Sequence, residues 1–256
     1  MKRHFFTCLA LSLSFLMPDA LMAQQVEGCQ RTAPRSNLVD NGKGIGIFFQ
    51  KNDPAHPKGF RCTYYENGKL QSEDLYKNDV REGIFKEYYV NGELETEAPF
   101  SNGKQEGIRK EYFENGKIRA KIPHKNGVRE GILREYYDNG KLETEVLFSN
   151  GKQEGIRKEY FENGKIMMEV PYKNGVLEGT FKQYYESGKL YLEGSYKNNK
   201  TEDLFKAYFE SGKLWMETPH KDGKREGIAK EYFEDGKLKS ETSYKNDKPD
   251  GQPKHY

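Results

Sequence analysis

The feature that most constrains this chain is a 24-residue period. A pair of aromatic residues recurs at that spacing eight times, without insertion or deletion. The pairs are Tyr64-Tyr65, Tyr88-Tyr89, Tyr112-Phe113, Tyr136-Tyr137, Tyr160-Phe161, Tyr184-Tyr185, Tyr208-Phe209 and Tyr232-Phe233. A period of this length indicates one supersecondary unit stacked repeatedly, in which neighbouring units bury each other's apolar sides.

Two turn signals accompany each aromatic pair. The first follows the pair directly, and the second lies eleven residues further on, as at Asn102-Gly103. The first set is Asn67-Gly68, Asn91-Gly92, Asn115-Gly116, Asn139-Gly140, Asn163-Gly164, Ser187-Gly188, Ser211-Gly212 and Asp235-Gly236. Because Asn and Gly tolerate positive backbone angles, we predict that each unit is two short strands joined by a two-residue hairpin turn.

The register of the hairpin follows from the position of this turn. With Asn91-Gly92 as the two turn residues, the predicted pairs are Tyr89 with Leu94, Tyr88 with Glu95, and Lys86 with Glu97. The Lys/Glu pair recurs in most units, and opposite charges across a hairpin contribute roughly 0.2–1 kcal/mol each. The register therefore predicts two faces. One carries Tyr89, Leu94, Ala98 and Phe100, and the other carries Lys86, Tyr88, Glu95 and Glu97.

A glycine precedes the first strand of seven of the eight units, as at Gly83 and Gly107, and Asp203 replaces it in the other. The register places Gly83 opposite Phe100, an arrangement typical of a ring packed closely on backbone. Hairpins stacked in sequence then form an all-β fold. We predict tandem 24-residue β-hairpin repeats in an elongated, twisted, antiparallel, single-layer meander.

The chain is expected to have three parts. Residues 1–23 form a secretory signal peptide, with Lys2 and Arg3 before an apolar run of about a dozen residues and cleavage near Ala23. Residues 24–58 form a non-repeat capping segment. Residues 59–256 hold the eight hairpin repeats and a C-terminal cap with Pro249, Pro253 and Tyr256. A lipoprotein alternative would use Cys29, which lies far downstream of the apolar run.

Cysteine usage agrees with an exported protein. Only Cys29 and Cys62 remain after cleavage, and in an oxidising compartment they either pair or stay as two free thiols. A pair would tie the N-terminal segment to the first strand. One disulfide is not a framework, so the repeats themselves must hold the fold together.

Charge and motif content argue against several functions. Removing Lys2, Arg3 and Asp19 from 42 basic and 40 acidic residues leaves 40 and 39, a balance that does not favour nucleic-acid binding. His124 and His220 occupy a position that is aromatic in other units, so we interpret them as packed rings. Lys and Glu repeat in every unit, whereas a catalytic pair should be singular. We therefore expect no enzyme, no metal site and no cofactor.

One column of the repeat departs from its usual polar character. Gln71, Glu95, Arg119, Glu143 and Lys239 become Met167, Tyr191 and Trp215 in three consecutive units. Equivalent positions in adjacent units lie about 9.5 Å apart. The predicted register places these residues beside Tyr160, Tyr184 and Tyr208 on the charged face, as one stripe of six large side chains. Such a stripe is a partner-binding site, local packing that stiffens the sheet, or a surface covered by a terminal segment.

The unit G-I-x-K-E-Y-[YF]-x-N-G-K-L resembles the MORN-variant repeats of bacterial YwqK-type proteins, a family described as antitoxins of toxin–antitoxin systems. The likeness runs from about Gly59 to Tyr256. It implies a hairpin-repeat sheet, and for related MORN repeats protein or phospholipid contact.

The function that we expect is an exported, periplasmic or secreted, scaffold that holds another protein on its β surface. One alternative is an antitoxin or immunity protein that neutralises a toxin. Another is a module that attaches to an envelope lipid or polysaccharide. A membrane-surface partner is left to that last alternative and is not predicted.

Overall fold

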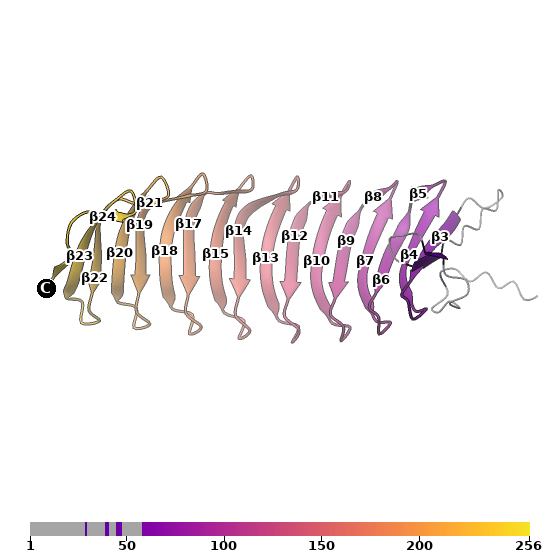
Figure 1. Ribbon diagram of the computed structural model, residues 1–256, viewed down its shortest axis with the longest axis horizontal. Helices are drawn as coiled ribbons and strands as arrows, with labels where there is room; N and C mark the ends of the chain where they lie inside the picture. Colours follow the sequence, from indigo (N-terminus) through magenta and orange to yellow (C-terminus); the bar gives the residue numbers. More distant parts are fainter. Residues whose placement is uncertain (1–28, 30–38, 41–44, 48–57) are drawn as a thin grey trace, which may run out of the picture.

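The computed structural model describes residues 29, 39–40, 45–47 and 58–256. The predicted signal peptide, 1–23, and most of the capping segment lie outside the described residues. Every regular element within the described residues is a β-strand, and the strands form one antiparallel sheet that extends as a long ribbon (Figure 1). Each strand pairs with its neighbours in sequence. The prediction of an all-β, single-layer hairpin meander is therefore confirmed.

The strands follow one another along the ribbon. At the N-terminal end lie β1 (Val39–Asp40), β2 (Ile45–Ile47), β3 (Lys58–Tyr64), β4 (Leu70–Lys77), β5 (Val80–Arg81), β6 (Gly83–Tyr88), β7 (Leu94–Ser101), β8 (Lys104–Gln105) and β9 (Gly107–Tyr112). The middle holds β10 (Ile118–Lys125), β11 (Val128–Arg129), β12 (Gly131–Tyr136), β13 (Leu142–Ser149), β14 (Lys152–Tyr160), β15 (Ile166–Lys173), β16 (Val176–Leu177) and β17 (Gly179–Tyr184). The remainder is β18 (Leu190–Lys197), β19 (Lys200–Tyr208), β20 (Leu214–Lys221), β21 (Lys224–Arg225), β22 (Gly227–Tyr232), β23 (Leu238–Lys245), β24 (Lys248–Pro249) and β25 (Lys254–His255).

The two turns of each unit have different geometries. At the first, the Tyr89 carbonyl accepts from Gly92 N–H and Tyr89 N–H donates to the Glu93 carbonyl, both at 2.8 Å. Gly92 has a φ of 97° while Asn91 keeps a negative φ, so this is a three-residue loop that ends in a glycine bulge. The predicted two-residue turn is wrong at this site.

The two-residue turn lies instead at the second signal. There Asn102 and Gly103 both have positive φ, at 50° and 75°, and Ser101 pairs with Lys104. Two positive angles in succession define the tight hairpin turn whose twist matches its strands. This turn joins one repeat to the next.

The three-residue loop changes the register near the aromatic pair. Lys86 pairs with Glu97 and Gly83 with Phe100, as predicted. Tyr88, however, pairs with Leu94, and Glu95 is left out of the ladder as a bulge residue. The predicted pairs of Tyr88 with Glu95 and of Tyr89 with Leu94 are therefore wrong.

The bulge also reassigns residues to the two sides of the sheet. We call the side that carries Lys86, Glu97, Tyr88 and Leu94 the ladder face. The other side, the bulge face, carries the columns of Phe85, Glu87, Thr96, Ala98 and Phe100. The column of Glu95 belongs to the bulge face, because Lys239 in that column and Ser240 beside it both contact Glu231. Leu94 and Glu95 have thus exchanged the sides predicted for them.

The repeated glycine also lies close to the preceding hairpin. Gly107 has a φ of 97°, and a Cβ there would lie 3.2 Å from Pro99 Cγ of the preceding hairpin. The same approach to a proline recurs at Gly131, Gly179 and Gly227. Glycine suits both this backbone angle and this close neighbour.

Hydrogen bonds tie each unit to the next. The Glu that precedes the repeated glycine accepts a backbone N–H from the tight turn of the following unit, as between Glu106 Oε2 and Asn126 N at 2.6 Å. The same bond joins Glu82 to Asn102, Glu130 to Asn150, Glu154 to Asn174, Glu178 to Asn198, Glu202 to Asp222 and Glu226 to Asn246. This Glu-to-turn hydrogen bond, which we call the Glu staple, joins successive hairpins at one edge of the ribbon.

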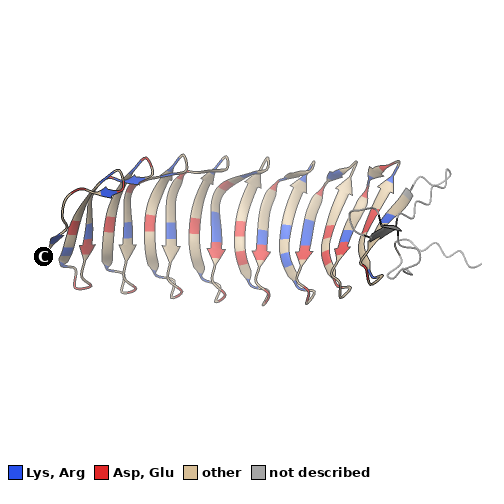
Figure 2. Cartoon of the chain, viewed as in Figure 1, with Lys and Arg blue, Asp and Glu red and all other residues tan. Residues whose placement is uncertain are grey.

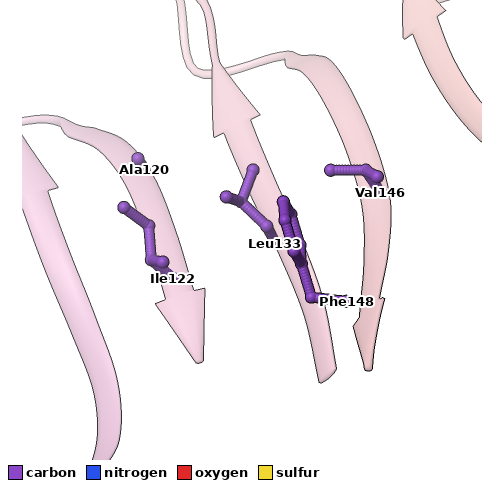
Figure 3. Close-up of a cluster of buried hydrophobic side chains, with 5 residues drawn as sticks. All are labelled: Ala120, Ile122, Leu133, Val146 and Phe148. Carbon is purple, nitrogen blue, oxygen red and sulfur yellow. The ribbon is translucent and has the colours of Figure 1, made fainter. Parts of the chain in front are cut away.

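Burial is shallow and local in the described residues. One cluster on the bulge face joins side chains from β10, β12 and β13 (Figure 3). Its members are Ala120, Ile122, Leu133, Val146 and Phe148. A single layer cannot enclose a deep core, so neighbouring units stabilise each other through such clusters.

A second cluster lies on the ladder face at the N-terminal end. Cys62, Tyr64, Leu70 and Tyr88 are buried there, with Cys29 packed against them. Cys29 and Cys62 form a disulfide, with their Cα atoms 5.9 Å apart. Cys29 therefore lies against this end of the ladder face.

Candidate functional site

A row of alternating charges runs along the ladder face. Lys and Glu from successive strands pair across the sheet, and the alternation of basic and acidic positions is visible along the ribbon (Figure 2). Ion pairs join neighbours in the row, as between Lys110 Nζ and Glu97 Oε1 at 2.6 Å. The row runs Glu73, Lys86, Glu97, Lys110, Lys121, Arg134, Glu145, Lys158, Glu169, Lys182, Glu193, Lys206, Glu217, Lys230, Glu241 and Lys254.

Tyrosine hydroxyls also form hydrogen bonds with carboxylates of this row. In five of the aromatic pairs the first tyrosine donates to a Glu of the preceding unit, as from Tyr184 to Glu169 at 2.8 Å and from Tyr208 to Glu193 at 2.7 Å. Burial together with this hydrogen bond raises the pKa of Tyr184 and Tyr208 to about 12. These groups hold their protons firmly, which suits a structural role and not proton transfer.

A distinct surface lies on the bulge face of β15, β18 and β20. Three consecutive units carry an apolar pair at the bulge, namely Met167-Met168, Tyr191-Leu192 and Trp215-Met216. All six side chains are partly exposed. The other units carry Gln71-Ser72, Glu95-Thr96, Arg119-Ala120, Glu143-Thr144 and Lys239-Ser240 at these positions. We call the six apolar residues the bulge patch.

The rest of the predicted stripe lies on the opposite side of the sheet. Tyr160 pairs with Ile166, and Met168 with Glu159, so Met167 is the residue left out of the ladder. Tyr160, Tyr184 and Tyr208 belong to the ladder face. The prediction that they form one stripe with Met167, Tyr191 and Trp215 is therefore wrong, because the bulge turns that column to the other side.

The aromatic neighbours of the bulge patch are the second members of the pairs. The Tyr191 ring lies 5.0 Å from that of Tyr185, and the Trp215 ring lies 6.1 Å from that of Phe209. Because aromatic pairs at such distances attract each other, these contacts hold the large side chains in place. The patch is therefore preorganised by its own scaffold.

The patch also coincides with a loss of acidic residues beside it. The column of Glu87, Glu111, Glu135 and Glu159 continues as Gln183 and Ala207. In the third unit, Glu111 accepts from both Arg109 and Arg119, at 2.9 and 2.8 Å. The same area is thus an ion-pair network near β9 and an apolar surface near β18.

Met168, Leu192 and Met216 were not predicted as site residues. Strict alternation along a strand assigns them to the side opposite Met167, Tyr191 and Trp215. The bulge places both members of each pair on one face, so the signal lies in the dipeptides and not in a single column.

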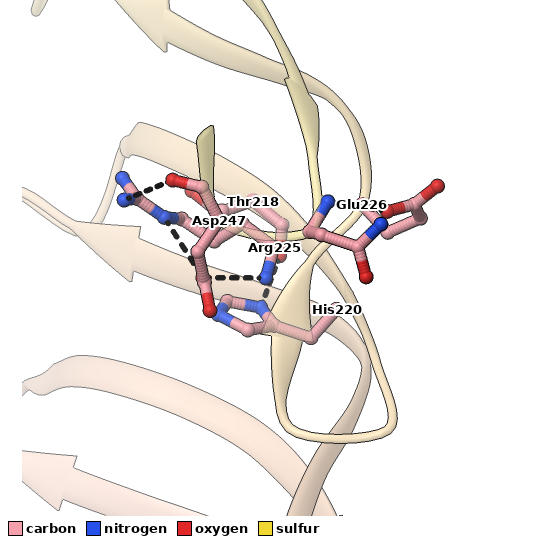
Figure 4. A network of polar contacts seen from close by, with 6 residues as sticks. Thr218, His220, Arg225, Glu226 and Asp247 are labelled. Atoms are coloured by element: carbon pink, nitrogen blue, oxygen red, sulfur yellow. Dashed lines mark hydrogen bonds and ion pairs between the residues drawn. The ribbon is translucent and has the colours of Figure 1, made fainter. Parts of the chain in front are cut away.

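The histidines sit among aromatic rings. The His220 ring lies 4.7 Å from that of Phe205, and His220 Nδ1 lies 3.0 Å from the Thr218 carbonyl oxygen. Near it, Arg225 donates to Asp247 from its backbone N–H at 2.9 Å (Figure 4). Within the described residues, no group of three His, Cys, Asp or Glu side chains could hold a metal ion.

These features define a class of protein: a single-sheet β-repeat protein whose hairpins pair only with their neighbours. The chain belongs to the MORN repeat variant family. The family model matches eight times, at residues 61–78, 81–102, 105–126, 129–150, 153–174, 177–198, 204–222 and 225–246. A comparison with curated proteins gives no match. No helix in the described residues is long and apolar enough to cross a membrane.

Proposed function

We propose that the protein is an exported, non-catalytic repeat scaffold that binds another protein through the bulge patch. The observation that carries this proposal is the replacement of polar bulge residues by apolar ones in three consecutive units. Contiguous apolar surface on a folded protein is typical of a contact site. Aromatic residues and Met are enriched at such sites.

The dimensions of the patch suit one protein contact. Adjacent units lie about 9.5 Å apart along the ribbon, so three units span about 19 Å from first to last bulge. Tyr191 and Trp215 supply large rigid anchors, and Met167, Met168 and Met216 supply flexible ones. A partner would dock across the strands and remove these side chains from water.

Two observations support export. The first residues have the layout of a secretory signal, with cleavage near Ala23. The disulfide between Cys29 and Cys62 is of a kind that persists in oxidising compartments. The proposed location is therefore the periplasm or the medium.

The test replaces Met167, Tyr191 and Trp215 together by Glu. Glu occupies this column naturally at Glu95 and Glu143, so the fold should accept it. An affinity pull-down of the mature protein from its own cell envelope should capture a partner that the triple variant loses, with unchanged far-UV circular dichroism.

The matched control is Gln71→Glu with Lys239→Glu, which adds charge to the same column outside the patch. This control should capture the partner as the parent protein does. Equal capture by the triple variant would rule out the bulge patch as the site. Capture of an envelope lipid or polysaccharide, released by added salt, would favour surface attachment instead.

The antitoxin alternative has one supporting observation, the likeness of the repeat to YwqK-type proteins. In that case the partner on the bulge patch is an exported toxin. Co-expression with a toxin encoded beside this gene should then protect cells, and the triple Glu variant should not.

A further inference from the structure

The charge row of the ladder face has one break. From Glu73 to Lys254, basic and acidic residues alternate strand by strand, except that Lys121 stands where the pattern calls for Glu. Lys110, Lys121 and Arg134 are consequently three adjacent cations on β9, β10 and β12. Like charges directly opposite each other destabilise a sheet, so this arrangement favours an added anion.

The two outer cations are already paired, and the central one is not. Lys110 Nζ lies 2.6 Å from Glu97 Oε1, and Arg134 Nε lies 2.8 Å from Glu145 Oε2. Lys121 Nζ faces the ring of Tyr136, 5.7 Å from its centre. No carboxylate within residues 58–256 lies within ion-pair distance of Lys121. Lys158, Lys182 and Lys206 also have no ion pair within the described residues, but each stands between two Glu residues of the row. Lys121 stands between two cations instead, so its charge is the one that neighbouring carboxylates do not balance.

An exposed apolar row runs beside these cations on the same face. Ile108 is 50% exposed, Ile132 is 43% exposed and Ile156 is 52% exposed. Pro123 and Leu147 stand opposite the first two. The row stops after β15, where Thr180 and Ser195 take its place. The unpaired cation thus lies within the longest run of exposed aliphatic side chains on this face.

The N-terminal end of the ladder face has a contact from outside the repeats. There Cys29 packs on it, and the backbone N–H of Cys29 donates to Glu73 Oε2 at 3.4 Å. In the cluster that Cys29 contacts, Tyr64 and Tyr88 are 2% and 3% exposed, whereas Tyr112 and Tyr136 are partly exposed. At Glu73 the charge row accepts a hydrogen bond from the backbone N–H of Cys29. At Lys121 the same row presents a hydrogen-bond donor, which would bind an acceptor such as a carboxylate.

We propose that the ladder face between β9 and β13 binds an acidic segment of a partner protein. A carboxylate of that segment binds the Lys121 ammonium, and aliphatic side chains next to it pack on Ile108, Ile132 and Leu147. This surface lies on the opposite face from the bulge patch, so it stands independently of the function proposed above.

The local chemistry favours a peptide over a polyanion. Glu97 and Glu145 flank the three cations and would repel the regular charges of a nucleic acid or an anionic membrane. A single carboxylate fits between them. A phosphate backbone has no apolar groups to pack on the adjoining Ile side chains, whereas a peptide with apolar side chains does.

The test measures binding by fluorescence anisotropy. The probes are short synthetic peptides with one Asp or Glu flanked by Ile, Leu or Val, and matched peptides with Lys in place of the acidic residue. The parent protein should bind the acidic set and not the Lys set. Lys121→Glu restores the regular charge row, so it should fold, and it should weaken binding about tenfold or more.

The matched control is Lys182→Gln, which removes one cation from a regular part of the row and should leave binding unchanged. The triple Glu variant of the bulge patch should also bind the acidic peptides normally. Failure of the parent protein to bind them, equal binding of the Lys set, or unchanged binding by Lys121→Glu would overturn the proposal. So would Lys121-dependent binding to phosphatidylglycerol vesicles that exceeds binding to the peptides.

Discussion

Two stretches of this chain have the same sequence and different surroundings. Ser101–Ile118 recurs without change as Ser149–Ile166, two units later. In the first copy the strand is interrupted at Glu106, between β8 and β9, whereas in the second β14 runs without a break. The difference must come from neighbouring residues.

The residue opposite the interruption differs between the two copies. Pro99 lies there in the first copy and Leu147 in the second, where Leu147 pairs with Glu154. Proline lacks the N–H needed to complete the ladder, which explains the break opposite Pro99. A break also occurs at Glu82 opposite Leu75, so proline is sufficient for the interruption and is not required for it. β19, the other long strand of this kind, faces Ser195, which also has an N–H.

The residues that follow the two copies also separate their surfaces. Arg119-Ala120 follows the first, and Arg119 joins Arg109 on Glu111. Met167-Met168 follows the second copy. There Glu159 forms an ion pair with Arg157, at 2.8 Å, and with no second arginine among the described residues. An identical repeat is therefore part of an ion-pair network in one place and the edge of an apolar patch in the other.

Alanine at the shared glycine should give the largest difference between the copies. Gly107 and Gly155 both have positive φ, so either substitution should cost about 1–2 kcal/mol of stability. At Gly107 the new Cβ would also lie 3.2 Å from Pro99 Cγ, whereas nothing lies within 4 Å at Gly155. Gly107→Ala should therefore cost about 1 kcal/mol more.

Urea unfolding of both variants measures this difference. Equal losses of unfolding free energy would show that the backbone angle alone requires glycine and that the proline contact is irrelevant.

Phenylalanine at the shared tyrosine should have a smaller effect. Tyr112 donates to Glu97 at 3.0 Å, so Tyr112→Phe should cost about 0.5–1.5 kcal/mol. In the second copy the corresponding acceptor, Glu145, is bound by Arg134, and Tyr160 has no hydrogen bond to it within the described residues. Tyr160→Phe should thus be nearly neutral.

The same tyrosine predicts a dependence on high pH. Burial and the bond to Glu97 raise the pKa of Tyr112 from 10.0 to about 12. A raised pKa adds stability that is fully present below the unfolded value and is lost as pH rises through the folded one. The parent protein should lose stability between about pH 10 and 12, and Tyr112→Phe should lose less over that window.

Exchanging the residues opposite the interruption should have the smallest effect on stability. Leu147→Pro should interrupt β14 as Pro99 interrupts the first copy, at a cost of about 1 kcal/mol or less, because other units accept proline there. Faster amide hydrogen exchange around Glu154 is the measurement. Exchange that stays as slow as in the parent would mean that proline does not cause the break.

The sequence predicted the architecture because the period is exact in length and the Lys/Glu pairs identify one register. It did not predict the bulge, since both turns contain Asn-Gly. A signal was nevertheless present. Ser187 and Ser211 replace Asn at the first turn, where φ is negative, whereas the second turn carries only Asn or Asp, which tolerate positive φ.

The placement of the candidate sites depended on that same bulge. Met167, Tyr191 and Trp215 stand out in the sequence because each breaks a polar column. Their partners, Met168 and Met216 among them, could be grouped with them only once the extra residue was known to turn both members of a pair to one side. Lys121 was hidden because it replaces one charged residue by another.

The Glu that staples each hairpin to the next has a consequence for scale. Within the described residues, strand pairing and this staple reach no further than the adjoining hairpin, so no contact depends on the total length. Each 24-residue unit therefore adds about 9.5 Å to the length of the sheet. Inserting or deleting a whole unit between Lys121 and Met167 would change the spacing between the two surfaces and leave the chemistry of each intact.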